Sequence, residues 1–209
     1  MIKKFFLFII VIILPCLLFF YPMFSQFFSA DDWFHLHISE INSTNEFFNF
    51  FRFTKNDQTA SFYRPLSTQV FFFLLHNFFS LHAFPYYLVV FVFFIVTLWL
   101  LFLFLQKMTR DRTLSLIITM MYALSHTHVT HLFFLSSFQE LSLVFWSLLT
   151  LILWQQNNKK KLLLSCLTWI AALLSKETAV ILPVLAWLTD LSNLNLVAPL
   201  PHHNQSYLV

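Results

Sequence analysis

The chain contains no glycine, and only 10% of its residues are charged. The absence of glycine excludes a Gly-rich phosphate-binding loop, and it leaves close helix contacts to alanine, serine and threonine. Soluble domains carry about 25% charged residues, so the low charge content argues against an ordinary soluble domain. The two cysteines, Cys16 and Cys166, both lie in hydrophobic stretches, and they therefore do not indicate a disulfide framework.

Hydrophobic residues dominate the sequence, at 59% of 209 residues, and thirty of them are phenylalanine. The first apolar run, 5–24, has the length of about 20 residues that crosses a bilayer. We expect it to be an uncleaved helix, because it is longer than the core of a typical signal peptide. Further apolar runs occupy 84–105, 113–123, 141–154, 162–174 and 178–191. They predict an all-α, polytopic transmembrane helix bundle of about six spans.

The segment between the first two long apolar runs mixes polar and aromatic residues. Its Phe-rich part, Phe47-Phe48-Asn49-Phe50-Phe51, is typical of a helix that lies in the membrane interface. The stretch 65–80 is apolar but is interrupted by His76 and Asn77. It is either a second interfacial helix or the beginning of a span, and the count of six spans assumes the first alternative.

The distribution of lysine and arginine predicts the sidedness of the bundle. With the N-terminus inside, eight of the twelve basic residues face the cytoplasm: Lys3, Lys4, Lys107, Arg110, Arg112, Lys159, Lys160 and Lys161. The remaining four lie outside: Arg52, Lys55, Arg64 and Lys176. We therefore expect a multi-pass protein of a bacterial plasma membrane with a cytoplasmic N-terminus.

Two adjacent carboxylates, Asp31 and Asp32, follow the first apolar run directly and precede Trp33. Neighbouring carboxylates repel each other and are costly to desolvate at a membrane surface. They can bind a divalent cation, hold a cationic group or take a proton from a hydroxyl. The alternative is an acidic loop that is simply solvated.

Three further polar groups share the predicted outer side with the acidic pair. They are Tyr63-Arg64-Pro65, the turn from His126 and His128 to Glu140, and Ser175-Lys176-Glu177. Taken singly, each has a plain structural explanation, because a basic residue near the end of a span usually snorkels to the interface. The histidines are also better explained as a polar helix end than as a metal site. Together, the groups suit a substrate that carries a phosphate and a polar acceptor.

These motifs, in order, carry a family resemblance. The run "SADDWFH", then "YRPLSTQVFF", then a His-containing turn and "LLSKETAVILPVL" resembles the N-terminal part of the GT-C class of membrane glycosyltransferases. More narrowly, it is similar to the dolichyl-phosphate-mannose–protein mannosyltransferase and aminoarabinose transferase group. The similarity covers residues 5–191, which correspond to the first third to half of such an enzyme. Thr127 departs from the pattern, because proline is common there.

The resemblance implies roles for particular residues. It places the catalytic carboxylate on Asp31 or Asp32, which would activate the acceptor or position a divalent cation. It implies that Arg64 and Lys176 bind the phosphate of the donor. The resemblance also implies four further substrate-binding residues, for which the sequence suggests no separate role. They are Tyr63, His128, Glu140 and Glu177.

The resemblance also implies the partners. They are a polyprenyl-phosphate-linked sugar as donor, membrane lipid, and a protein or glycan acceptor whose hydroxyl receives the sugar with inversion. We expect no nucleic-acid partner. Residues 1–192 would form the N-terminal transmembrane module and 193–209 a polar tail, truncated or disordered. A separately encoded C-terminal half would then complete the enzyme, unless the chain is an incomplete and inactive fragment.

Two other classes of function stay open from the sequence alone. A transporter or flippase also gathers charges in the membrane, typically on broken helices near the midplane. The break at Ser175-Lys176-Glu177, between two short apolar runs, fits that description. A non-catalytic assembly subunit would need no polar constellation at all.

Overall fold

The computed structural model describes residues 8–41, 44–52, 62–156 and 158–197. Within these ranges, every regular element is a helix, which confirms the predicted all-α class. Lys3, Lys4 and Lys55 of the predicted topology lie outside the described residues. The expected tail begins inside a helix, because α11 runs from Leu182 to Val197, and the remainder of the tail lies outside the described residues.

Two helical segments in the described part of the chain are long and apolar enough to cross a bilayer. They are α6, Ala83–Thr109, and the segment Leu135–Trp154, which ends with α9, Phe138–Trp154. Helix α7, Arg112–Ala123, has 12 residues. At about 1.5 Å per residue, its length is well short of the roughly 30 Å of a hydrocarbon core. The bundle of six spans therefore stays a prediction.

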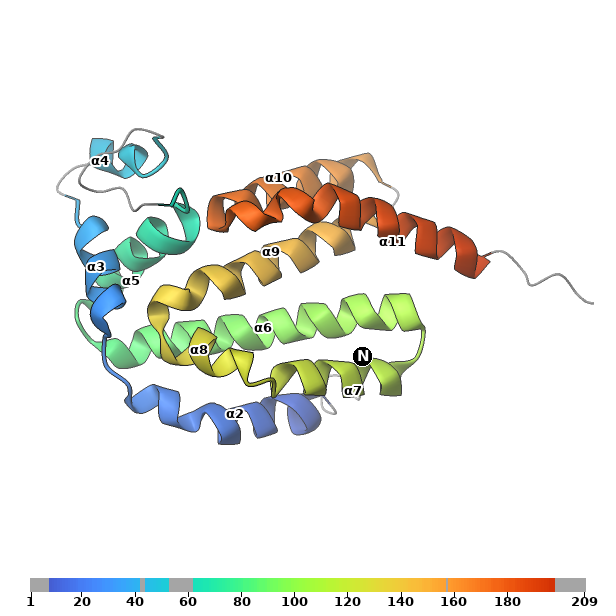
Figure 1. Ribbon diagram of the computed structural model, residues 1–209, viewed down its shortest axis with the longest axis horizontal. Helices are drawn as coiled ribbons and strands as arrows, with labels where there is room; N and C mark the ends of the chain where they lie inside the picture. The colour runs from blue at the N-terminus through green and yellow to red at the C-terminus, as the bar shows by residue number, and fades with distance from the viewer. Residues whose placement is uncertain (1–7, 42–43, 53–61, 157, 198–209) are drawn as a thin grey trace, which may run out of the picture.

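The long helices run side by side, and several of the short ones gather at one end of the molecule (Figure 1). Helix α6 packs against α7 and α9, and α9 packs against both α10, Lys159–Ser175, and α11. The short helices at one end are α3, Ala30–Ile38, α4, Thr44–Asn49, and α5, Phe71–Phe79. We call this the pocket end, because the candidate site described below lies there.

One face of α6 forms the centre of the largest core. Tyr86, Val90, Phe94 and Leu98 are completely buried, at 0% exposure. Their spacing of four residues places them on one stripe of the helix. Phe20, in α2, Leu14–Phe20, meets Phe94 with ring centroids 5.9 Å apart. The opposite stripe of α6, including Val92 and Val96, is exposed, as expected of a helix whose outer face meets lipid.

The basic loops lie together at the end opposite to the pocket end, here called the basic end (Figure 1). Helix α6 ends at Thr109 and α10 begins at Lys159, so Lys107 and the lysine run 159–161 share this end. Lys107 Nζ donates to the carbonyl of Gln155 at 3.1 Å, which joins the two loops. Asp111 caps α7 by accepting from the backbone of Thr113 at 2.8 Å. The fold therefore separates this basic patch from Arg64 and Lys176.

The stretch 65–80 forms one short helical segment that ends before α6 begins. It begins as η3, Leu66–Val70, and continues as α5. Ser80 then adopts a positive φ of 50° and ends the helix, three residues before α6 begins. The first apolar run is helical from η1, Ile9–Ile13, through α2 to η2, Tyr21–Ser25. Both agree with the positions of the elements predicted from the sequence.

Candidate functional site

A pocket at the pocket end brings together side chains from three separate parts of the chain. Its volume is about 260 Å³. Its lining comes from α3, from the segment that enters η3, and from the first turn of α9: Asp31, Phe34, His35, Phe62, Arg64, Thr68 and Gln139. We call it the Arg64 pocket. Two of the predicted site residues, Asp31 and Arg64, therefore line one cavity.

Arg64 holds three separate segments together. Its Nε donates to Glu177 Oε2 at 2.8 Å, and its Nη2 donates to Glu177 Oε1. Nη1 donates to Gln139 Oε1 at 2.7 Å. The guanidinium carbon also lies 4.7 Å from the centre of the Phe62 ring, a cation–π distance. Only 11% of the Arg64 side chain is exposed, so the guanidinium is fixed in place rather than snorkelling.

A second ion pair lies directly beside the first. Lys176 Nζ donates to Glu140 Oε1. Lys176 directly precedes Glu177, and Glu140 directly follows Gln139, the residue that accepts from Arg64. The break after α10 and the first turn of α9 therefore both contribute to the two pairs. We call Arg64, Gln139, Glu140, Lys176 and Glu177 the ion-pair cluster. Its two cations face two carboxylates, so the formal charges of the cluster cancel.

The backbone around Lys176 explains why Lys176 and Glu177 both reach the ion-pair cluster. Helix α10 ends at Ser175, and Lys176 is extended, with φ −161° and ψ 137°. A short 3₁₀ helix, η5, then begins at Glu177 and runs to Ile181. Ser175 anchors the break, since its carbonyl accepts from Ser67 Oγ at 2.7 Å and its hydroxyl lies 2.9 Å from that of Ser142.

Asp32 is committed to the structure. Its side chain is completely buried, and Oδ2 accepts from the backbone N and the hydroxyl of Ser29 at 2.8 and 2.9 Å. The bond from the Ser29 backbone is one half of a capping box at the start of α3, whose other half is the bond from the Asp32 backbone N to the Ser29 side chain. Oδ1 accepts from the backbone N of Ser136 at 2.7 Å, which ties α3 to the turn before α9. The acidic pair is therefore divided, and only Asp31 faces the pocket.

Asp31 is exposed and has His35 on the same face of α3, one helical turn later. His35 stacks on Phe72 with ring centroids 5.3 Å apart. Burial lowers the pKa of His35, and the nearby carboxylates of Asp32 and Asp31 oppose that effect. A neutral imidazole and a solvated carboxylate thus form one wall of the pocket.

Tyr63 supports the pocket rather than lining it. Its hydroxyl donates to the carbonyl of Phe51 at 2.9 Å, which connects the segment before η3 to the end of α4. Burial raises the pKa of the Tyr63 phenol, so the hydroxyl stays protonated and serves as a donor.

His128, a predicted substrate-binding residue, lies in the core of the molecule. His128 is 3% exposed and packs against Phe94 and Tyr122, with ring centroids 4.9 and 4.6 Å away. Burial lowers its pKa to about 4. It does not line the Arg64 pocket. Burial lowers the pKa of its neighbour His131, the Glu140 carboxylate opposes that effect, and the Lys176 charge adds to it.

A divalent cation does not fit the carboxylates that the sequence suggested. Both oxygens of Asp32 accept hydrogen bonds from protein donors, which leaves Asp31 alone. Across the described residues, no group of three or more His, Cys, Asp or Glu side chains is placed to hold a metal ion. We therefore derive no chemical step through a metal.

The structure adds pocket residues that the sequence motifs did not identify. These are Phe34, His35, Phe62, Thr68 and Gln139. Helical spacing was an available signal for two of them, since His35 follows Asp31 by four residues and Thr68 follows Arg64 by four. Gln139 carries no such signal, because its role depends on where α9 packs.

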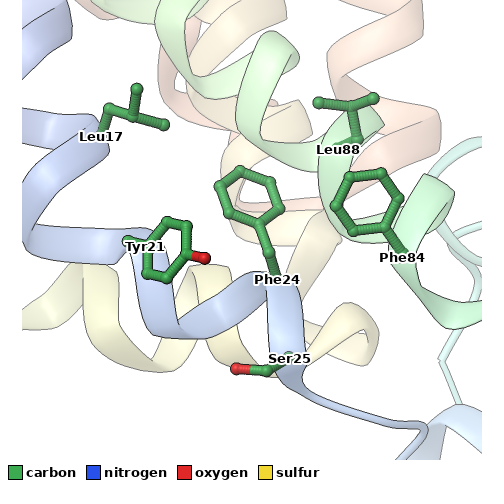
Figure 2. A pocket seen from close by; sticks show the side chains of 6 residues that line it. All are labelled: Leu17, Tyr21, Phe24, Ser25, Phe84 and Leu88. Carbon is green, nitrogen blue, oxygen red and sulfur yellow. The ribbon is translucent and has the colours of Figure 1, made fainter.

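A second pocket, of about 420 Å³, is almost entirely apolar. It lies between α2 with η2 and the start of α6, and Figure 2 shows Tyr21 and Phe24 on one side and Phe84 and Leu88 on the other. The Phe24 and Phe84 ring centroids are 5.8 Å apart. Its lining holds hydroxyls but no charged side chain, so it has no group that would anchor an anion.

No family model, no curated protein and no solved structure matches this chain. What the protein does must therefore be inferred from its own residues and from the geometry of the Arg64 pocket.

Proposed function

We propose that this chain is a glycosyltransferase-like membrane protein whose Arg64 pocket receives the phosphate of a polyprenyl-phosphate-linked sugar. Arg64 anchors the phosphate, Lys176 adds a second positive charge, and Asp31 orients or deprotonates the hydroxyl acceptor. The protein crosses the membrane several times with the basic end in the cytoplasm. The pocket end then faces the outside, where the protein or glycan acceptor is found.

One observation carries this proposal: Asp31 and Arg64 line the same pocket, although the two residues come from separate segments. A carboxylate beside a fixed guanidinium supplies the two groups that the transfer needs. Arginine offers two parallel N–H donors, which match the oxygens of a phosphate. An exposed carboxylate can accept the proton of an incoming hydroxyl.

The chemistry follows from the leaving group. When the bond between the anomeric carbon and the phosphate oxygen breaks, negative charge grows on that oxygen, and fixed N–H donors lower the energy of this state. The acceptor hydroxyl attacks the anomeric carbon from the opposite face, so a single displacement inverts the configuration. The hydroxyl proton passes to Asp31. The products are the glycosylated acceptor and a polyprenyl phosphate.

Binding of the product tests the anchor directly. The purified protein in lipid nanodiscs should bind a long-chain polyprenyl monophosphate and discriminate against the matching polyprenol. Arg64→Ala should weaken this binding at least about tenfold, as expected for a lost charge-assisted, bidentate contact. Arg52→Ala is the matched control, because Arg52 is exposed and lies outside the pocket.

Transfer tests the proposed base. With polyprenyl-phosphate-linked sugars as donors, release of polyprenyl phosphate reports turnover whatever the acceptor is. The assay is run with the whole chain in the same lipid nanodiscs. Asp31→Asn should retain polyprenyl phosphate binding and lose release. If all variants bind the polyprenyl monophosphate and the matching polyprenol equally well, the ion-pair cluster does not bind phosphate. Its role would then be to hold the helices together, as in an assembly subunit.

A further inference from the structure

The edge of Arg64 that would bind a phosphate is already occupied by a side chain of the same protein. Nε and Nη2 both donate to the Glu177 carboxylate, one to each oxygen. Nη1 is held separately by Gln139 at 2.7 Å. A carboxylate and a phosphate present paired oxygens to a guanidinium in the same way. Glu177 therefore stands in the position of the ligand.

The two members of this pair differ sharply in burial. The Arg64 side chain is 11% exposed, whereas the Glu177 side chain is 57% exposed. Moving Glu177 into water exposes little new surface, while moving Arg64 would break its contacts with Gln139 and Phe62. Glu177 is thus the member that can leave, and Arg64 stays in place.

Protonation does not release Glu177 at physiological pH. The hydrogen bonds from Arg64 hold the pKa of Glu177 at about 2, and the charges of Arg64 and Lys176 act in the same direction. The Glu177 carboxylate therefore stays ionised, and paired with Arg64, at every physiological pH. Another anion has to displace it.

We propose that Glu177 is an internal competitor that sets the affinity and selectivity of the pocket. A phosphate group takes the Nε and Nη2 donors of Arg64, and Glu177 turns out to solvent. The inference rests on the proposed function, since it concerns the same pocket. When Glu177 occupies the site, the apparent Kd of a ligand equals its intrinsic Kd divided by the fraction of molecules in which the site is free. The pocket therefore excludes neutral head groups, which cannot displace a carboxylate.

The exchange also keeps the charge of the site nearly constant. In the structure the formal charges of the cluster cancel, with Arg64 and Lys176 facing Glu177 and Glu140. A bound phosphate replaces one anion with another on Arg64, so the buried guanidinium is never left without a counter-charge. An unpaired buried charge would be strongly unfavourable.

Glu177→Gln tests the competition. The amide keeps the size of the side chain and its ability to accept one hydrogen bond, but it removes the charge. Binding of a long-chain polyprenyl monophosphate in nanodiscs should become about twofold to fivefold tighter, the range expected when a partly exposed ion pair no longer competes. Glu40→Gln is the control, because Glu40 is an exposed carboxylate at the same end of the molecule.

A second arm separates the head group from the chain. Inorganic phosphate is titrated against the same variants. Tightening by Glu177→Gln toward both probes shows that a phosphate alone displaces Glu177. Tightening toward the polyprenyl phosphate alone shows that the hydrocarbon chain must also be bound. Either result supports the inference.

Three outcomes would overturn it. If Glu177→Gln binds no tighter than the wild type while Arg64→Ala loses binding, Glu177 does not compete and the proposed function stands. If Glu40→Gln tightens binding equally, the effect is one of overall charge. If neither the wild type nor Glu177→Gln binds either probe, the competition and the proposed function fall together.

Discussion

The Arg64 guanidinium and the Glu177 carboxylate meet edge to edge, with Nε 2.8 Å from Oε2. The two residues are 113 positions apart in the chain. Their pairing joins the segment that enters η3 to the break between α10 and α11. It is also the contact that a phosphate would replace in the proposed chemistry of the pocket.

A double-mutant cycle on Arg64 and Glu177 should measure their coupling. Because Glu177 is largely solvated, we expect a modest coupling free energy of about 0.5–1 kcal/mol, in line with partly exposed ion pairs. It should fall as the salt concentration rises. The measurement is reversible unfolding of Arg64→Ala, Glu177→Gln and the double variant in detergent. Additive effects at low salt would show that the pair contributes nothing to stability.

Stability should also respond to acid through Glu177. Its pKa lies at about 2 in the folded protein, below its ordinary value of 4.5. The contribution of the pair is therefore fully present above about pH 4.5 and is lost as the pH falls toward 2. The free energy of unfolding, measured between these pH values, should decline in the wild type as the pH falls. It should decline less in Glu177→Gln. Identical pH profiles for the two proteins would contradict the shifted pKa.

The two aspartates of the acidic pair should behave differently. Asp32→Asn replaces an acceptor of three hydrogen bonds with an amide that cannot accept them all. We expect a loss of about 1–3 kcal/mol in the free energy of unfolding, the usual cost of an unsatisfied buried group. Asp31→Asn, at an exposed site, should change it by less than about 0.5 kcal/mol. Equal losses would remove the distinction between a structural and a pocket aspartate.

Labelling should place the two ends of the molecule on opposite sides of the membrane. In a variant with Cys16 and Cys166 replaced by serine, single cysteines are introduced at Gln26 and at Asn158. Gln26 is exposed next to α3, and Asn158 caps α10 at the basic end. An impermeant thiol reagent applied from outside should modify the first and not the second. Modification of both from one side would contradict the proposed topology.

Periodicity and apolar length located the helices well because they depend on local sequence. The run 84–105 was predicted as a span and is contained in α6, and the apolar stretch 65–80 is helical through η3 and α5. Local sequence does not establish the number of helices that cross a membrane. Helix α7 lies at its predicted position but has 12 residues, so its length alone does not establish a crossing.

The candidate site was predictable only in part. The sequence placed Arg64, Lys176, Glu140 and Glu177 on one side, and the structure brings them into one cluster. It could not say which cation meets which carboxylate, since those pairings depend on how α9 and α10 pack. His128 illustrates the same limit, because its motif position gave no indication that it is buried against Phe94.

The sequence by itself determined the helical class, the positions of the helices and the separation of the basic segments from the other polar motifs. These properties follow from hydrophobic periodicity and charge, which act over a few residues at a time. Only the tertiary structure divided Asp31 from Asp32, because the bond from Ser136 to Asp32 crosses 104 positions of the chain. Packing decides which of two adjacent carboxylates is buried as a cap and which stays free to meet a ligand.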